Sequence, residues 1–172
     1  MRITNIKAFV LSDPSNGKAH WVSHFRVPSA TELLGILETD ECIEGFGLAT
    51  SYTDISPLAR TLATGLTDLI IGADPLSPEQ IYNKIFSTSW KRISFERGWS
   101  REALVRLSAA VDIACWDIIG KRASLPLYQL MGGWCHEVPY YVTCAYYQDG
   151  KDLSALRDEM ERLKSQGHTR FK

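Results

Sequence analysis

The sequence has no long apolar run: its hydrophobic stretches fall well short of the roughly 20 residues that span a bilayer. Its first residues also lack the apolar core and small-residue cleavage site of a secretory signal. Positive charge is not in excess, because 19 Lys and Arg face 20 Asp and Glu, and no basic stripe stands out. We therefore expect a cytoplasmic protein that binds neither a membrane nor nucleic acid.

Motifs for disulfide frameworks and metal sites are missing as well. The four cysteines are widely spaced without a Cys-x-x-Cys pair, which favours reduced structural thiols. The four histidines show no zinc-binding spacing. Gly45-Phe-Gly47 is not a dinucleotide fingerprint, because no third glycine and helix follow in the required place. With 45% hydrophobic and 23% charged residues, the composition is typical of an ordinary globular protein.

The first part of the chain reads as strands followed by helices. Alternating apolar positions predict a strand near Ile6 to Val10 and another over residues 20–27. Residues 34–37 and 45–48 are separated by an acidic turn and suggest a hairpin. Ser56-Pro57 and Ser77-Pro78 then mark the starts of two helices. The pattern indicates an α+β domain.

A longer helix is predicted from about Arg101 to Gly120, with Ser100 as its N-cap. Asp112 and Asp117 resemble a catalytic pair, but they are five positions apart on this helix, so their side chains diverge by roughly 140°. That divergence favours a structural role in which Asp117 pairs with Lys121 one turn later.

After Gly132-Gly133 the pattern changes to that of a parallel sheet. Residues 138–146 form a nearly continuous apolar and aromatic strand, as expected where both faces of a sheet are covered. Residues 152–166 form an amphipathic helix that ends at Gly167, and residues 169–172 begin another strand. This order is one βα unit of a parallel sheet and the start of the next.

Two segments carry a family resemblance: Ala109-Ala-Val-Asp-Ile-Ala-Cys-Trp-Asp-Ile-Ile-Gly-Lys121 and Leu125-Pro-Leu-Tyr-Gln-Leu-Met-Gly-Gly133. Together they resemble the junction between capping domain and barrel in the mandelate racemase and muconate lactonizing enzyme branch of the enolase superfamily. The resemblance extends along the whole chain. It implies an enolase-like N-terminal capping domain over residues 1–133. Residues 134–172 would then be the first βα unit of an incomplete (β/α)8 TIM-type barrel, a fold of about 250 residues.

Enzymes of this branch abstract a proton alpha to a carboxylate, with Mg²⁺ bound by acidic residues at the ends of the third, fourth and fifth barrel strands. The sequence stops at Phe171-Lys172, where the family enters its second barrel strand. We therefore expect most of the catalytic site, including every metal ligand, to lie outside this chain. The resemblance also implies a small carboxylate as substrate and a homo-oligomer at full length.

Lys172 is the one candidate catalytic residue. Members of this branch typically have Lys-x-Lys at the end of the second barrel strand, and Lys172 matches the first of the two lysines. Period two in a strand places both lysines on one face, where each lowers the pKa of the other. The alternative is that Lys172 is an ordinary surface lysine.

Specificity in the family comes partly from two capping loops that move, which the resemblance places at about residues 12–24 and 50–54. Polar and aromatic side chains there and at the end of the first barrel strand are the candidate substrate contacts: His20, Trp21, His24, Tyr52, Thr143, and Tyr146 or Tyr147. Trp21 alternates with Phe25, so a place in the core is the competing interpretation for it.

These residues favour the N-terminal part of a Mg²⁺-dependent dehydratase of acid sugars, because polar loop groups suit a polyhydroxylated acid. Racemase, epimerase or cycloisomerase chemistry is the alternative within the superfamily. A hypothesis from another class is a non-catalytic capping or oligomerisation fragment.

Overall fold

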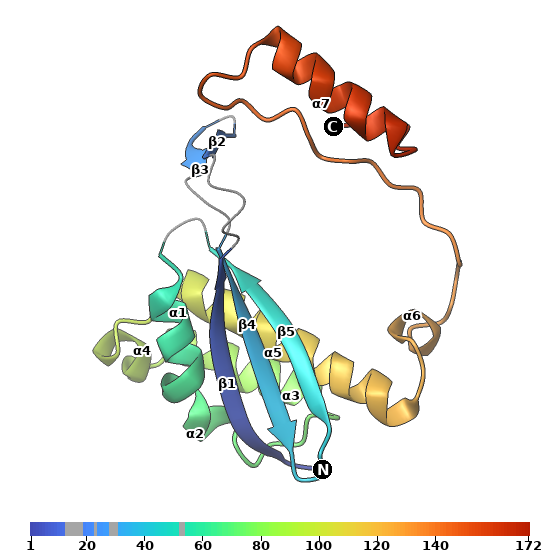
Figure 1. The fold of residues 1–172 in the computed structure, drawn as a ribbon. Helices are drawn as coiled ribbons and strands as arrows, with labels where there is room; N and C mark the ends of the chain where they lie inside the picture. Colours follow the sequence, from blue (N-terminus) through green and yellow to red (C-terminus); the bar gives the residue numbers. More distant parts are fainter. Residues whose placement is uncertain (13–18, 23, 28–30, 52–53) are drawn as a thin grey trace. The chain divides into compact units, whose positions relative to one another are not determined.

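The computed structural model describes residues 1–12, 19–22, 24–27, 31–51 and 54–172 (Figure 1). The chain divides into two compact units. One consists of residues 1–12 and 31–134, and the other of residues 13–30 and 135–172. The domain boundary expected after residue 133 stays a prediction for the whole protein, and each unit is described here by itself.

The first unit is built on a three-stranded antiparallel sheet of order β1-β4-β5. Its strands are β1 (Ile3–Ser12), β4 (Thr31–Thr39) and β5 (Glu44–Thr50). The hairpin expected from the sequence is β4 and β5, in which Gly35 pairs with Gly47. Alternate residues of β4 are buried, so one face of the sheet belongs to the core, as period two requires.

Helices follow the sheet strands in the chain, and the longest of them, α5 (Arg101–Ala123), packs along the inner face of the sheet (Figure 1). The others are α1 (Ser56–Arg60), η1 (Thr61–Gly65), α2 (Thr67–Ile70), α3 (Pro78–Phe86), η2 (Ser87–Trp90), α4 (Arg92–Glu96) and α6 (Leu127–Leu130). Of these, α1, η1 and α2 contact β1, whereas α6 packs on α5. Strands followed by helices make this unit the α+β capping fold that the sequence predicted. Its largest fully buried side chains come from both layers: Ile3, Leu33, Leu37, Ile55, Leu62, Leu66, Ile70, Ile85, Leu104, Leu107, Ile118 and Val111.

The long helix α5 begins as predicted but ends later. The Ser100 hydroxyl accepts a hydrogen bond from the Ala103 amide at 3.0 Å, which is the expected N-cap contact. The helix then runs past Gly120 to Ala123, and Ser124 ends it in the left-handed region at φ 54°. Gly120 is a packing residue rather than a cap, because a Cβ there would lie 3.2 Å from a methyl carbon of Leu127.

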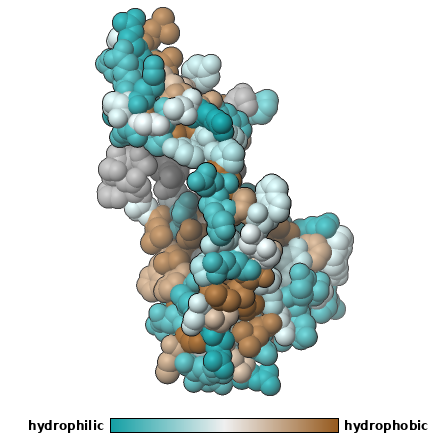
Figure 2. Space-filling model, turned by 90° about the vertical axis from the view of Figure 1, so that its right-hand side faces the viewer, coloured by the Kyte–Doolittle hydropathy of each residue, from teal (hydrophilic) through white to brown (hydrophobic). Residues whose placement is uncertain are grey.

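Apolar side chains also reach the surface of this unit. Figure 2 shows one side of the molecule, where they lie between hydrophilic ones. On the outer sheet face, Phe9 and Leu48 flank Leu34 in register and are 47% and 44% exposed. Within the described residues, no helix is both long enough and apolar enough to cross a bilayer.

The second unit contains β2 (His20–Trp21), β3 (Arg26–Val27) and α7 (Leu153–Ser165). The single strand expected over residues 20–27 is thus a short antiparallel hairpin. Helix α7 matches the prediction closely, and the Asp152 carboxylate caps it by accepting the Ala155 amide at 2.9 Å.

The strand expected over residues 138–146 forms only a short parallel pairing, centred on Val142 and Phe171. Three backbone hydrogen bonds of 2.9–3.0 Å join residues 142–144 to residues 170–172. Strand, helix and parallel strand nevertheless follow in the order of one βα unit and the start of the next.

Cysteines in this fold are free thiols. Cys115 is buried in α5, and burial raises the pKa of its thiol to about 12, which keeps it protonated at neutral pH. The free thiols agree with the expected reduced state, and Cys115 has the buried position of a structural cysteine, whereas Cys42 is exposed.

Candidate functional site

The start of the barrel presents two different faces. Val142, Cys144 and Phe171 are half-buried on the side of α7, where the Cys144 sulfur lies 3.9 Å from the sulfur of Met160. Tyr141 and Thr143 alternate with these residues and are exposed on the opposite face. In a (β/α)8 barrel the face away from the helices is the interior.

Lys172 lies on this exposed face beside Thr143. The Lys172 amide donates to the Val142 carbonyl at 2.9 Å, and the Cys144 amide donates to the Lys172 carbonyl at 3.0 Å. This pattern places Lys172 directly opposite Thr143, and paired residues of parallel strands point to the same side. The Lys172 ammonium also lies 5.6 Å from the centre of the Tyr141 ring. The structure thus brings together two of the residues singled out in the sequence.

A second pair of candidates meets at the end of the first barrel strand. The rings of His20 and Tyr146 lie 4.6 Å apart at an angle of 47°. The Trp21 amide donates to the Tyr147 carbonyl at 2.8 Å, so β2 pairs with the backbone at the end of the first barrel strand. Trp21 and Phe25 are 43% and 42% exposed, and neither belongs to a core in this structure.

The remaining candidates are placed differently. His24 is exposed in the turn between β2 and β3. Tyr52 lies outside the described residues. In the part of the chain that the structure describes, no group of three or more His, Cys, Asp or Glu side chains could hold a metal ion. These residues therefore do not fit a magnesium site by themselves.

An ion pair that the sequence analysis missed supports the turn that carries Tyr146. Lys151 and Glu159 form this pair, and their side chains are only 13% and 24% exposed. Lys151 also donates to the Tyr146 carbonyl at 3.0 Å, while Glu159 accepts the Ala145 amide at 3.3 Å. The hydrogen bond from Lys151 lowers the pKa of the Glu159 carboxyl below its ordinary value, although partial burial opposes this.

The two aspartates of α5 do not form a catalytic pair. Asp117 binds the Lys121 ammonium at 2.6 Å, as its spacing predicted, and also accepts the Phe46 amide at 2.9 Å. Burial raises the pKa of Asp112, with a smaller contribution from Glu79. Asp117 thus ties α5 to β5, which is a structural role.

We expect Asp117→Ala to lower the free energy of unfolding by about 1–2 kcal/mol, because the Phe46 amide loses a charged acceptor. Chemical denaturation followed by far-UV circular dichroism measures this loss. Asp117→Asn keeps an acceptor oxygen and should lose less. Equal stability of Asp117→Ala and the unaltered chain would contradict the structural role.

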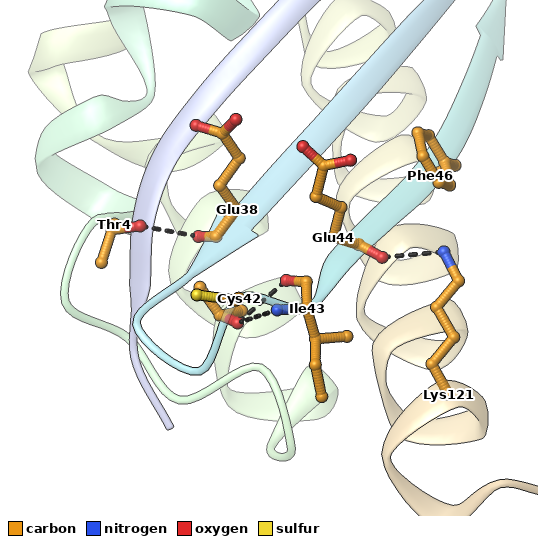
Figure 3. Close-up of a pocket in the computed structure, with 8 residues that line it drawn as sticks. Thr4, Glu38, Cys42, Ile43, Glu44, Phe46 and Lys121 are labelled. Carbon is orange, nitrogen blue, oxygen red and sulfur yellow. Dashed lines mark hydrogen bonds between the residues drawn. The ribbon is translucent and has the colours of Figure 1, made fainter.

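A depression of about 610 Å³ lies on the capping unit, and none of these candidates lines it (Figure 3). Two of its charged side chains have partners: Glu38 accepts from Lys7 and Asn5, and Lys121 donates to the backbone carbonyl of Glu44 at 2.8 Å. The Lys121 ammonium also lies 4.2 Å from the centre of the Phe46 ring. The Glu38 contacts join β4 to β1, and the Lys121 contacts join α5 to β5. We therefore assign these side chains a structural role and do not take the depression as the candidate site.

Comparison with known proteins decides the family. Residues 5–132 match the family described as mandelate racemase / muconate lactonizing enzyme, N-terminal domain. The chain belongs to this family. It is 32% identical over 123 residues to arabinonate dehydratase of Saccharolobus solfataricus, covering 72% of this chain and 31% of that protein. It is 27% identical over 180 residues to N-succinyl-L-Arg/Lys racemase of Bacillus cereus, covering 100% of this chain and 44% of that protein.

The fold of the family is shared over nearly the whole chain. A crystal structure described as mandelate racemase/muconate lactonizing enzyme from a marine actinobacterium, in complex with magnesium, superposes with a TM-score of 0.77 at 23% identity. The superposition covers 99% of this chain and 43% of the actinobacterial chain. This member of the mandelate racemase and muconate lactonizing enzyme family therefore spans less than half the length of the relatives named here.

Proposed function

We propose that this chain supplies the capping part and the first barrel strands of an enzyme that abstracts a proton alpha to a carboxylate. Among the reactions of the family we favour the dehydration of an acid sugar. Two relatives of about 32% identity, named arabinonate dehydratase and D-mannonate dehydratase, support this choice. The polar groups of the candidate loops suit the hydroxyl groups of such a substrate.

The observation that carries the proposal is the position of Lys172 beside Thr143 on the strand face that points away from α7. An ammonium group there would bind the substrate carboxylate and favour the negative charge that develops when the alpha proton leaves. It would also lower the pKa of a second lysine two residues later on the same face, which makes that lysine a base near neutral pH.

His20, Trp21, His24, Tyr52 and Tyr146 would contact the distal part of the substrate. His20 and Tyr146 already meet through their rings, so together they offer an imidazole and a phenol to substrate hydroxyl groups. Thr143 would add a hydroxyl beside Lys172. These side chains orient the substrate, and proton removal is assigned to the lysines.

Magnesium belongs to the rest of the parent protein in this proposal, because the described residues contain no set of ligands for it. We expect the isolated 172-residue chain neither to bind Mg²⁺ at a stoichiometric site nor to turn over acid sugars. Titration calorimetry and an assay for 2-keto-3-deoxy acids test the two parts. A stoichiometric Mg²⁺ site in this chain would contradict the assignment.

Racemisation or epimerisation is the second candidate, because the N-succinyl-L-Arg/Lys racemase matches along all of this chain. The two chemistries separate in deuterated water. A racemase exchanges the alpha hydrogen for deuterium and keeps every substrate oxygen, whereas a dehydratase releases water and forms a 2-keto-3-deoxy acid. Mass spectrometry of the product distinguishes these outcomes.

A non-catalytic capping or oligomerisation module is the third candidate. The nucleotide sequence after codon 172 decides between it and an enzyme. An open frame with a second lysine two codons on and acidic residues at later strand ends supports the enzyme. A stop codon supports the module.

A further inference from the structure

Three successive residues, 145–147, join the end of the first barrel strand to two other elements. On one side the Ala145 amide donates to Glu159 at 3.3 Å, and the Tyr146 carbonyl accepts from Lys151 at 3.0 Å. On the other side the Tyr147 carbonyl accepts from the Trp21 amide at 2.8 Å. The short segment thus connects α7 to β2.

Ala145 has a backbone conformation that needs support. Its φ of 61° lies in the left-handed region, which residues other than glycine, asparagine and aspartate rarely adopt. Such a residue keeps this conformation only where its surroundings impose it. The contacts to Ala145 and Tyr146 come from Glu159 and Lys151, which also bind each other.

The ion pair is shielded from water. The Lys151 and Glu159 side chains are 13% and 24% exposed, whereas the i,i+4 pair Arg92–Glu96 has exposures of 90% and 57%. Partly buried charges are screened less by salt than exposed ones, and each of these two also binds a backbone group. Lys151 and Glu159 therefore constrain the turn more than an exposed pair would.

We propose that Lys151 and Glu159 are positioning residues that hold the turn 145–147 in the conformation that receives β2, and that they thereby fix His20 against Tyr146. The exact distal group that these two rings recognise depends on the proposed function. The effect on the turn does not. Without the ion pair, Ala145 would leave the left-handed region, and the carbonyl that receives Trp21 would turn away.

Hydrogen exchange of the full 172-residue chain, followed by NMR, tests the effect on the turn. In Glu159→Ala we expect the Trp21 amide to exchange about tenfold faster or more, because its bond to Tyr147 forms less often. Glu161→Ala is the matched control, since Glu161 is an exposed carboxylate on the same helix. The amides of Leu33 and Leu104 in the capping unit should keep their rates in both variants.

Two further variants separate positioning from a general loss of stability. Glu159→Gln keeps an oxygen for the Ala145 amide and should exchange at a rate between those of the unaltered chain and Glu159→Ala. Adding Ala145→Gly to Glu159→Ala should restore part of the protection of Trp21, because glycine adopts positive φ without strain. If Glu159→Ala acted only by lowering the stability of the whole second unit, Ala145→Gly would give no such restoration.

Some results would overturn the proposal. Equal Trp21 exchange in Glu159→Ala and Glu161→Ala would do so, as would a Trp21 amide without protection in the unaltered chain. These measurements need no substrate, so they fail or succeed independently of the proposed function. In an active parent enzyme, Glu159→Ala should raise KM about tenfold with kcat within about twofold, because it loosens substrate contacts rather than proton removal.

Discussion

Lys172→Ala is expected to lower kcat by about 10²–10⁴-fold in the enzyme to which we propose this chain belongs, with an unchanged thermal midpoint. The reason is the position of the side chain. Lys172 is exposed on the strand face away from α7, so removing it empties no core. In the reaction, however, its charge would bind the carboxylate and keep the second lysine deprotonated near neutral pH.

The pH dependence gives this prediction its sharpest form. Loss of the Lys172 charge raises the pKa of the second lysine, so the limb of the pH–rate profile that reports the free base should move to higher pH. Lys164→Ala is the matched control, because Lys164 is an exposed lysine in the last turn of α7. Near-normal turnover of Lys172→Ala would return Lys172 to the role of an ordinary surface lysine.

The elements that the sequence predicted well are those whose signals are local. The helix α5 carries its own apolar stripe and its own N-cap at Ser100, and the hairpin of β4 and β5 is marked by two short segments with an acidic turn between them. Asp117 and Lys121 are one helical turn apart, so their ion pair follows from spacing alone. Such features need no knowledge of distant parts of the chain.

Features that depend on distant contacts escaped the sequence analysis. The left-handed Ala145 is held by Glu159, which comes from another element of the fold. Gly120 suggested a helix end, although the close approach of Leu127 explains it inside the helix. The first barrel strand was expected over residues 138–146 because that segment is continuously apolar and aromatic. An apolar run does not show how many of its residues pair with a neighbouring strand.

The candidate site divides in the same way. Thr143 and Lys172 could be placed on one face from period two and the expected parallel pairing. The contact of His20 with Tyr146 could not, since it joins residues more than a hundred positions apart and no pattern within either segment indicates it. The family resemblance identified both segments but carries no geometry between their side chains.

Gly45 and Gly47 do not form a dinucleotide fingerprint, and the packing of α5 explains why this strand has glycine at both positions. They lie on the inner face of β5, where α5 packs directly on the strand. A Cβ built on Gly47 would lie 1.8 Å from the Ala110 carbonyl oxygen, and one on Gly45 would lie 2.1 Å from the Ala114 carbonyl oxygen. Neither oxygen can turn aside, because both belong to the backbone of α5.

Gly47→Ala should therefore lower the free energy of unfolding of the capping unit by about 3 kcal/mol or more, since β5 and α5 must separate to admit one methyl group. This loss runs against local preference, because alanine in place of glycine otherwise favours a strand by about 0.5–1 kcal/mol. Thermal unfolding followed by far-UV circular dichroism would show a midpoint about 10 °C lower.

Gly35→Ala is the matched control, because Gly35 pairs with Gly47 but faces a side chain. A Cβ there would meet a methyl carbon of Leu62 at 2.9 Å, and that side-chain end can rotate away. We expect a loss of about 1 kcal/mol for this variant. Equal midpoints for Gly35→Ala and Gly47→Ala would show that α5 does not rest on the bare backbone of β5, and the glycines of this strand would then need another explanation.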